Sequence, residues 1–409
     1  MSKLTIERLG HLGNGVANTP EGPVFVPFSL PGEQVEGDIV DGRMQGARVL
    51  QGSRDRVAPV CPRFGTCGGC SLQHASDDLL ARWKGEIVQE ALRAQGLESR
   101  MQPVVVSPAN ARRRATFAAR RTKKGVLVGF HERASEAISG IGGCRLLCDD
   151  LLSALPALED LCRAGASRQS VVSMAVTASG GGADVGVSGA KELSPGLMTA
   201  VTSIARKHRL ARLVWNGEWV VTLDTPVQEF ALLPVVPPPD AFLQPTREGQ
   251  EALISAVLEI VGTGARHVVD LFAGCGTFTL PLARHSRVLA VESNAAALAA
   301  LEVAARMSAG LKPVATATRD LFRRPLLPDE LTRFDAAVID PPRAGAAAQA
   351  RALAASQVSR IAYVSCNPAT FARDAAILIK GGYRLERVLP VDQFRWSPHV
   401  ELVAQLNRT

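Results

Sequence analysis

Hydrophobic and polar positions alternate in short runs over the first 52 residues. The runs LTIERLG, GPVFVPF, EQVEGDIV and QGARVL have the length of single strands and are separated by turn sequences such as NG, PEG and DG. This pattern predicts a small antiparallel β-barrel or sheet. A barrel of this size can bind oligonucleotides, but a β module without a binding role has the same pattern.

The hydrophobic period changes to that of a helix between Ser76 and Leu97, where Ser76 can cap the N-terminus and Gly96 can end the helix. From residue 111 to residue 234, short apolar runs again alternate with Gly-Gly and Asn-Gly sequences, which predicts a β-rich central region. The stretch LLPVVPPPD, residues 232–240, is expected to be a linker, because consecutive prolines disfavour both helices and central strands.

Residues 241–409 alternate between helix and strand patterns. Strand-like runs include HVVDLFAG, RVLAVES, FDAAVIDPP and RIAYVSCNP, helical runs separate most of them, and a pair of strands closes the chain. This order predicts an α/β fold with a doubly wound parallel sheet. We therefore expect three domains, at residues 1–52, 53–235 and 236–409.

Composition narrows the class of protein. A chain of 409 residues that is 46% hydrophobic can build several cores. It has no run of 18 apolar residues and no apolar signal-peptide core, so we expect a cytoplasmic protein without membrane insertion. Its eight cysteines are then expected to be free, catalytic or metal-bound rather than paired in disulfides.

The net charge of +7 is concentrated in one segment. Residues 111–133 hold eight basic residues and one acid, and the rest of the chain is balanced. Clustered arginines suit phosphate binding, and a solvated basic face is the alternative interpretation. The RNA-binding candidates are Arg112, Arg113, Arg114, Arg120 and Arg121.

Three cysteines lie within ten residues, in the segment CPRFGTCGGC. Cys61, Cys67 and Cys70 have the spacing C-x5-C-x2-C, and the glycines between them let the loop fold around a metal centre. The candidates for a fourth ligand are Cys144, Cys148 and Cys162, and the first of these follows a Gly-rich bend that could return it to the others. Four thiolates can hold zinc or a [4Fe-4S] cluster, and the spacing does not decide between them.

Ligands of open α/β sheets bind at the carboxyl ends of the strands. The run DLFAGCGT, residues 270–277, contains Gly-x-Gly, which lets the backbone approach a nucleoside closely; a plain tight turn is the alternative. Glu292 ends the next strand about twenty residues later, where a carboxylate can accept hydrogen bonds from ribose hydroxyls. Because Thr279 occupies the last position of the dinucleotide pattern G-x-G-x-x-G, we favour adenosyl-methionine over NAD.

Two further strand ends carry Asp340-Pro-Pro-Arg343 and Ser365-Cys366-Asn367-Pro368. D-P-P-x turns also occur in methyltransferases that act on amines, so the thiol is the discriminating group. A thiolate can add to C6 of a pyrimidine and make C5 nucleophilic toward a methyl donor. The helix expected near Thr370 should lower the thiol pKa, and a buried structural cysteine is the alternative.

The covalent adduct then requires a base that removes the C5 proton. Glu401 lies at the start of the last strand and is the first candidate, with His399 second. A solvated glutamate is the alternative.

Motifs along nearly the whole chain resemble those of the iron–sulfur RNA uracil-C5 methyltransferases, of the type that makes 5-methyluridine in rRNA. The matching segments are GGCSLQH with the three cysteines, RRRATF, G-x-C-R-L-L, FLQP, DLFAGCGTFTLPLA, VES, DPPRAG, SCNPATFARD and HVELV. The resemblance implies a shortened TRAM domain, an RNA-binding β-barrel, at the front and a Rossmann-like methyltransferase domain at the end.

The resemblance also implies roles for single residues. Cys366 would be the nucleophile and Glu401 the general base. A [4Fe-4S] cluster would be bound by Cys61, Cys67, Cys70 and Cys144, with Cys148 not a ligand. The adenosyl-methionine positions would be Gln244, Phe272, Thr277, Glu292, Asp320 and Asp340. Thr246 and Thr277 stand where the family commonly has asparagine, and both can still donate and accept hydrogen bonds.

We therefore expect a monomeric enzyme that methylates C5 of a uridine, with 23S rRNA as the first candidate substrate. A tRNA uridine methyltransferase is the alternative within the fold, and those enzymes usually lack the four cysteines. A non-catalytic RNA-binding protein with a redox-sensing cluster is the alternative from another class; it predicts that adenosyl-methionine does not bind.

Overall fold

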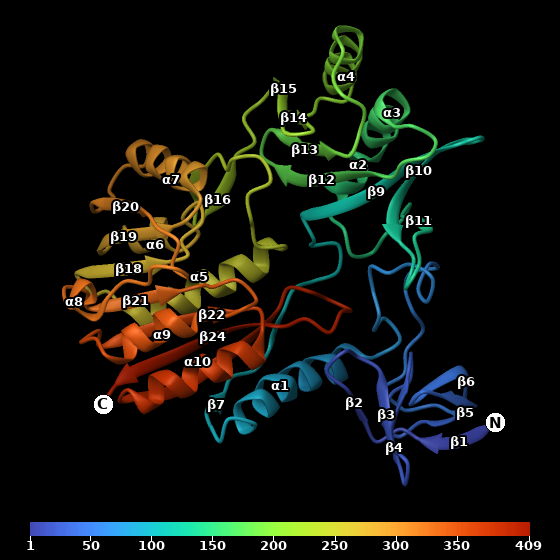
Figure 1. Cartoon of the computed structure of the whole chain (residues 1–409), viewed down its shortest axis with the longest axis horizontal. Helices are drawn as coiled ribbons and strands as arrows, with labels where there is room; N and C mark the ends of the chain where they lie inside the picture. Colours follow the sequence, from blue (N-terminus) through green and yellow to red (C-terminus); the bar gives the residue numbers. More distant parts are fainter.

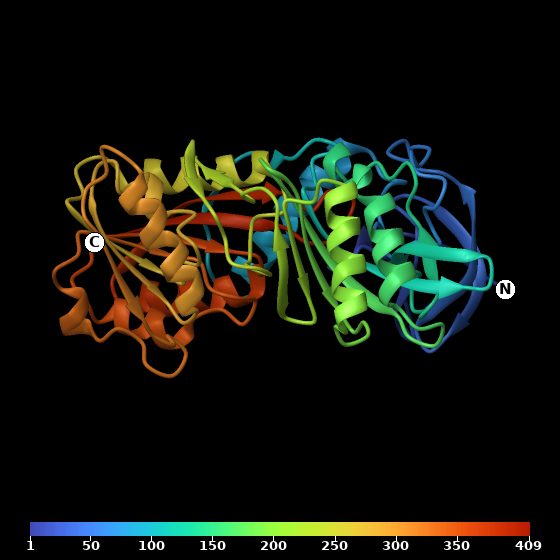
Figure 2. The same cartoon turned by 90° about the horizontal axis from the view of Figure 1, so that it is seen from above.

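The computed structural model describes residues 1–409 and contains three large sheets and one two-stranded hairpin. The N-terminal and C-terminal sheets lie at opposite ends of the molecule, and the central sheet lies between them along the chain (Figures 1 and 2). The parallel strands are confined to the C-terminal half, with few exceptions, as the sequence pattern predicts. No helix has the combination of length and apolar character that crossing a membrane requires.

The N-terminal sheet has six strands in the order β1-β5-β6-β4-β3-β2. They are β1 (Ser2–Thr5), β2 (Arg8–Leu9), β3 (Gly15–Thr19), β4 (Gly22–Val26), β5 (Gln34–Val40) and β6 (Arg43–Gln51). All pairs are antiparallel except β4 with β6, which confirms the expected small β module. Its small core includes Ile6, Val26, Val35 and Met44.

The central sheet has seven strands in the order β11-β10-β9-β12-β13-β14-β15. They are β9 (Arg114–Thr122), β10 (Gly125–His131), β11 (Ile138–Gly140), β12 (Val172–Ser179), β13 (Gly182–Ser188), β14 (Arg212–Trp215) and β15 (Glu218–Thr222). The helices α2 (Asp149–Ser153), α3 (Leu155–Gly165) and α4 (Pro195–Lys207) accompany it and were not expected. Leu158 and Leu161 of α3 and Val201 of α4 belong to the same core as Phe117 of β9, so the domain is mixed rather than purely β.

The linker predicted at residues 232–240 begins with ordered structure. β16 (Gln228–Phe230) and β17 (Leu233–Val235) form a hairpin, and the three prolines follow it outside any helix or strand. Phe230, Leu233 and Val235 pack into the C-terminal core, so the hairpin attaches this segment to the last domain.

The C-terminal sheet has the strand order β20-β19-β18-β21-β22-β24-β23-β7, and β8 also pairs with β23. Its elements follow the predicted order: α5 (Arg247–Val261), β18 (His267–Leu271), α6 (Thr279–Leu282), β19 (Arg287–Glu292), α7 (Ala295–Met307), β20 (Val314–Thr318), α8 (Pro328–Leu331), β21 (Ala336–Ile339), α9 (Ala347–Ala354), β22 (Arg360–Ser365), α10 (Pro368–Lys380), β23 (Tyr383–Asp392) and β24 (Glu401–Arg408). The strands β20, β19, β18, β21 and β22 are parallel, and β24 runs antiparallel between β22 and β23. Helices α5, α6 and α7 pack on one face, and α9 and α10 pack on the other.

A segment from the expected central domain belongs to this C-terminal sheet. Helix α1 (Asp77–Arg93) buries Val88 and Leu92 in the same core as α9 and α10, and it begins at the predicted cap Ser76. Strands β7 (Arg100–Met101) and β8 (Val105–Val106) pair in parallel with β23. The expected domain boundary at 235/236 is therefore wrong for residues 77–106, because these pairings join segments far apart in the sequence.

Candidate active site

A thiol and two carboxyl groups meet at the carboxyl edge of adjacent strands. Cys366 directly follows β22, Glu401 begins β24, and Asp340 directly follows β21, the other neighbour of β22. The antiparallel register pairs Ser365 with Leu402, so the next position sets Cys366 opposite Glu401. Short apolar strands thus deliver all three groups to one place, as the sequence predicts for chemistry at strand ends.

Burial dominates the electrostatics of the two carboxyl groups. Glu401 is 3% exposed, and burial raises its pKa to about 7, although a hydrogen bond from Gln393 acts in the opposite direction. Burial also raises the pKa of Asp340, and the charges of Glu401 and Asp270 add to that effect. A carboxylate whose pKa lies near neutrality is suited to general base catalysis.

The pKa of the Cys366 thiol is raised to about 11, first by burial and then by the charges of Glu401 and Asp340. The expected lowering by a helix N-terminus is therefore wrong for the free protein. Helix α10 does begin beside the thiol, with Asn367 as its cap. Arg343 acts to lower the thiol pKa, but desolvation and the two carboxylates outweigh its charge.

Sequence reasoning missed Gln393, which is 2% exposed and connects two predicted site residues. Its Nε2 donates to Gln244 Oε1 at 2.6 Å and to Glu401 Oε2 at 3.1 Å. Gln393 lies in no motif, because it occupies an irregular turn after β23 and reaches Glu401 only through the fold. His399, the second candidate base, is exposed, and its ring lies 5.8 Å from that of Phe394.

The glycine loop after β18 has the backbone geometry that a close nucleoside contact requires. Gly274 and Gly276 have positive φ angles, and so does Phe272, with φ 64°. A Cβ atom at Gly276 would lie 2.4 Å from a side-chain carbon of Leu301, so only glycine fits there. Gly274 donates its backbone N–H to Glu292 Oε2 at 3.1 Å, which ties the loop to the carboxylate predicted to hold a ribose.

Two more of the predicted cofactor residues, Asp320 and Thr277, lie at this loop. Asp320 follows β20 and accepts the backbone N–H of Phe322 at 2.9 Å, and the ring of Phe322 lies 5.5 Å from that of Phe272. Thr277 is half-buried within the loop. Thr246, the departure from the family pattern, caps α5 by accepting the N–H of Gly249 at 3.1 Å. A threonine therefore serves the helix N-terminus at this position.

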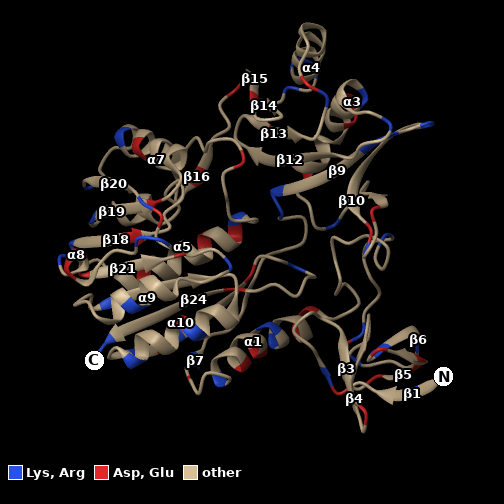
Figure 3. Cartoon of the chain, viewed as in Figure 1, with Lys and Arg blue, Asp and Glu red and all other residues tan.

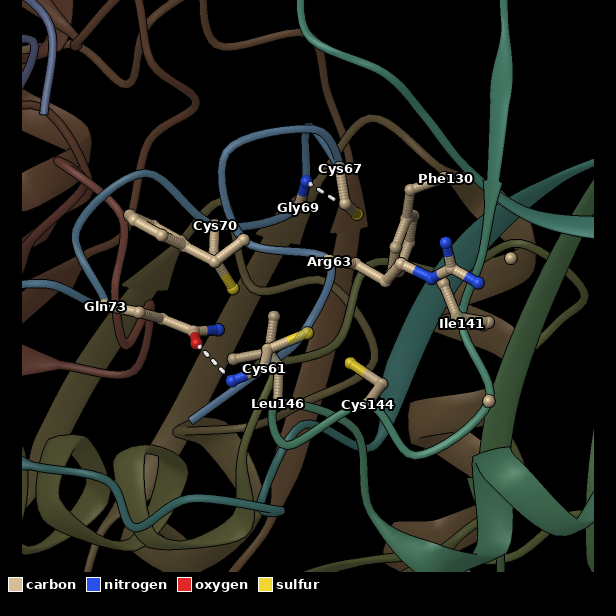
Figure 4. A pocket seen from close by; sticks show the side chains of 13 residues that line it. Cys61, Arg63, Cys67, Gly69, Cys70, Gln73, Phe130, Ile141, Cys144 and Leu146 are labelled. Carbon is tan, nitrogen blue, oxygen red and sulfur yellow. Dashed lines mark hydrogen bonds between the residues drawn. The ribbon is translucent and has the colours of Figure 1, made fainter. Parts of the chain in front are cut away.

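The four cysteines expected to bind metal line one apolar pocket. Figure 4 shows the sulfurs around this pocket, whose wall also includes Phe130, Ile141 and Leu146; its cysteines are Cys61, Cys67, Cys70 and Cys144. The other two candidates lie elsewhere, because Cys148 precedes α2 and Cys162 is buried in the central core. The thiols are not drawn together closely enough to form a ligand group for a single metal ion.

Basic residues occur on β9 and in the turn that joins it to β10 (Figure 3). Arg112, Arg114, Arg120 and Arg121 are partly exposed. Arg113 is only 4% exposed and donates to the backbone oxygen of Gln244 at 3.1 Å and to Gln250 Oε1 at 2.7 Å. The expectation that Arg113 contacts RNA is therefore wrong, because its guanidinium is used inside the protein.

Similarity to known proteins agrees with this geometry. The family model for tRNA (uracil-5-)-methyltransferase matches residues 202–409. An RNA methyltransferase of Brucella suis is 45% identical over 99% of this chain and 98% of its own length. The 23S rRNA (uracil(1939)-C(5))-methyltransferase RlmD of Nitrosococcus oceani is 34% identical over 100% of this chain and 96% of its own length.

Among solved structures, the tRNA (uracil-54, C5)-methyltransferase of Pyrococcus abyssi, in complex with S-adenosyl-L-homocysteine, covers 99% of both chains with a TM-score of 0.78. At 24% sequence identity this likeness concerns the fold. The sequence matches reach across all three sheets, and they confirm the RNA uracil-C5 methyltransferase family but not its iron–sulfur type. The chain belongs to the RNA (uracil-C5)-methyltransferase family.

Proposed function

We propose that the protein methylates C5 of a uridine in RNA through a covalent adduct with Cys366, and that adenosyl-methionine supplies the methyl group. The thiolate adds to C6, and the electrons of the C5–C6 double bond move to O4 as an enolate. C5 then attacks the methyl group, whose bond to the sulfonium sulfur breaks. Glu401 removes the C5 proton, the double bond forms again, and the thiolate leaves.

The observation that carries this proposal is the opposition of Cys366 and Glu401 on β22 and β24. A thiol alone would suit many roles. Glu401 narrows them, because a buried carboxyl group with a pKa near neutrality can act as the base that removes the C5 proton in the last step. The uridine must leave its stack to reach both groups, which is general for enzymes that act on a base.

For the methyl donor we propose a site at the glycine loop. Glu292 would accept the ribose hydroxyls, and Phe272 and Asp320 would border the adenosine. Thr277, Asp340 and Gln244 would contact the rest of the donor. The positive φ angles of the loop and its connection to Glu292 support this arrangement.

We propose rRNA rather than tRNA as the substrate. The support is the 34% identity to the Nitrosococcus oceani enzyme, whose name specifies 23S rRNA. The support for tRNA as the substrate is the similarity to the Pyrococcus abyssi structure, whose sequence is 24% identical. Mapping 5-methyluridine in the rRNA and tRNA of a strain that lacks the gene separates the two: loss from tRNA alone contradicts the rRNA assignment.

The reaction itself is tested with RNA that contains 5-fluorouridine. Fluorine replaces the C5 proton, so the adduct cannot resolve and the protein stays bound to the RNA. We expect a covalent complex with the native protein and none with Cys366→Ala; a complex that persists in Cys366→Ala would exclude Cys366 as the nucleophile. Glu401→Gln should accumulate the adduct on ordinary RNA without turnover.

We also propose that Cys61, Cys67, Cys70 and Cys144 hold a [4Fe-4S] cluster. The support is the apolar pocket that all four cysteines line, since a thiolate-bound group placed there would contact the four sulfurs. A single zinc ion would require sulfurs about 3.8 Å apart. A cluster is larger and holds its ligands around a cavity, and it would link the cysteine loop to the central sheet.

RNA binding and assembly complete the proposal. We propose that residues 1–52 act as a TRAM-like RNA-binding module and that Arg112, Arg114, Arg120 and Arg121 contact phosphates. The protein is proposed to act as a cytoplasmic monomer. We propose domains that follow the sheets: a central domain around residues 107–227, and a methyltransferase domain that includes α1 and the hairpin of β16 and β17.

A further inference from the structure

The carboxylate of Glu401 receives one hydrogen bond from a side chain, and its donor is Gln393. The same Nε2 atom donates its second hydrogen to Gln244 Oε1, so one amide connects the residue assigned to the methyl donor with the residue assigned as base. All three side chains are buried. No sequence motif contains Gln393, and the mechanism above does not use it.

The surroundings hold Gln393 in a fixed position. The preceding residue, Asp392, pairs with Lys84 of α1 at 2.5 Å, and its backbone oxygen accepts the N–H of Ser107 at 2.9 Å. On the other side, a Cβ atom at Gly249 would lie 2.6 Å from Gln393 Oε1 and 2.7 Å from Gln393 Cβ. Helix α5 therefore leaves space for this amide only because residue 249 is glycine.

The orientation of the amide has a chemical consequence. Nε2 faces two acceptor oxygens, whereas Oε1 is buried without a hydrogen-bond partner. The reverse orientation would set Oε1 against the ionised carboxylate of Glu401, which is unfavourable. A donor directed at a buried carboxylate favours its ionised form, and a base must be ionised to accept a proton.

We propose that Gln393 is a positioning residue for the general base, which keeps the Glu401 carboxylate ionised and aimed at the substrate side of Cys366. The inference rests on the proposed function, because it assigns a role in the step that Glu401 performs. Through Gln244 the same amide connects this carboxylate to the methyl-donor site. Gln393 does not touch the reacting atoms and acts only through Glu401.

The test separates the last step from those before it. Gln393→Met keeps a similar length but cannot donate a hydrogen bond. With 5-fluorouridine RNA, complex formation needs only thiol addition and methyl transfer, so we expect its rate to change by less than about threefold. Turnover of ordinary RNA should fall by about tenfold or more, because it depends on the base. The adduct with ordinary RNA should accumulate.

A pH profile provides a second readout that a purely structural role would not change. Without the donor, the ionised form of Glu401 is less favoured, so the midpoint of the turnover profile should move to higher pH. Gln349→Met is the matched control: Gln349 is fully buried in the same domain and also makes two amide hydrogen bonds, to the backbone of Leu326. It should leave the midpoint unchanged.

Each outcome has a defined meaning. A parallel fall in the rate of complex formation and in the turnover rate would assign Gln393 to methyl-donor binding through Gln244, which would overturn the inference. Unchanged turnover of ordinary RNA would also overturn it. If the native protein forms no complex with 5-fluorouridine RNA, the proposed function fails and the inference with it. If Gln393→Met does not fold, Gln393→Glu retains the shape: its second carboxyl group should move the midpoint to higher pH, and an unchanged midpoint would overturn the inference.

Discussion

Lys84 Nζ and Asp392 Oδ1 form an ion pair at 2.5 Å, and both side chains are buried, at 0% and 2% exposure. Lys84 also donates to the backbone oxygen of Phe394 at 3.1 Å. A helix from the first quarter of the chain is thereby fixed to the turn that precedes Glu401.

Removing one partner of this pair should be strongly destabilising, because it leaves an uncompensated charge in the interior. We expect Lys84→Met to lower the free energy of unfolding by about 3–5 kcal/mol. Urea denaturation measures the change. The double variant Lys84→Met/Asp392→Asn should recover part of the loss, and a double variant as unstable as the single one would contradict the charge-pair explanation.

The pH dependence of turnover should reflect Glu401. Its pKa is raised to about 7, and the base must be deprotonated, so the rate should fall as the pH drops through 7. The measurement is turnover of ordinary RNA with both substrates saturating. A rate that stays constant from pH 6 to pH 8 would argue against Glu401 as the base.

Asp270 should make the stability of the C-terminal sheet pH-dependent. Burial raises its pKa to about 7, and its Oδ2 accepts the hydroxyl of Thr279 at 2.6 Å. A folded-state pKa above the unfolded value means that stability falls as pH rises from about 4 to about 7. The free energy of unfolding of Asp270→Asn, relative to that of the native protein, should therefore increase by about 2–3 kcal/mol as the pH rises from 5 to 8. Parallel stability curves for the two proteins would contradict this.

The cysteine pocket predicts that Cys144 is needed for iron binding and that Cys148 is not. Cys144 lines the pocket and Cys148 does not. We expect Cys144→Ser to lose bound iron and the associated visible absorbance, whereas Cys148→Ser keeps both. Iron content per protein, measured after anaerobic purification, gives the answer; equal iron in the two variants would exclude the proposed ligand set.

The partly exposed arginines of β9 should contribute to RNA binding through phosphates. For Arg120→Gln/Arg121→Gln we expect weaker binding, and a slope of log affinity against log salt that is lower by about 0.7–0.9 for each phosphate that the variant no longer neutralises. Filter binding across a salt series measures both. Arg306→Gln/Arg351→Gln, which removes the same charge from exposed positions on α7 and α9, should change neither.

The C-terminal fold could be predicted closely because its information is local. The strands β21 and β22 are short apolar runs that end in a polar motif, so Asp340 and Cys366 could be assigned to one edge from sequence alone. Helices α3 and α4 had usable signals too, including Ser194, which caps α4. The strand-like sequence patterns on both sides of these helices hid those signals.

Other features depend on contacts that no local pattern contains. Arg113 lies between Arg112 and Arg114, which are partly exposed. Only its contacts with Gln244 and Gln250 show that Arg113 is internal. Gln393 likewise gains its significance from an oxygen of Glu401 eight residues later and one of Gln244. The β7 and β8 pairings involve two residues each and carry no periodicity.

The pairing of Met101 with Val388 also sets an order of events during synthesis of the chain. Helix α1 and strand β7 leave the ribosome long before β23, and at about 5–20 residues per second the delay is roughly 15–60 s. During that time Val88 and Leu92 lack the core that covers them in the finished protein. The nascent chain therefore displays an apolar helix face until its last strands are made, and a chaperone that holds this face should raise the yield of folded protein.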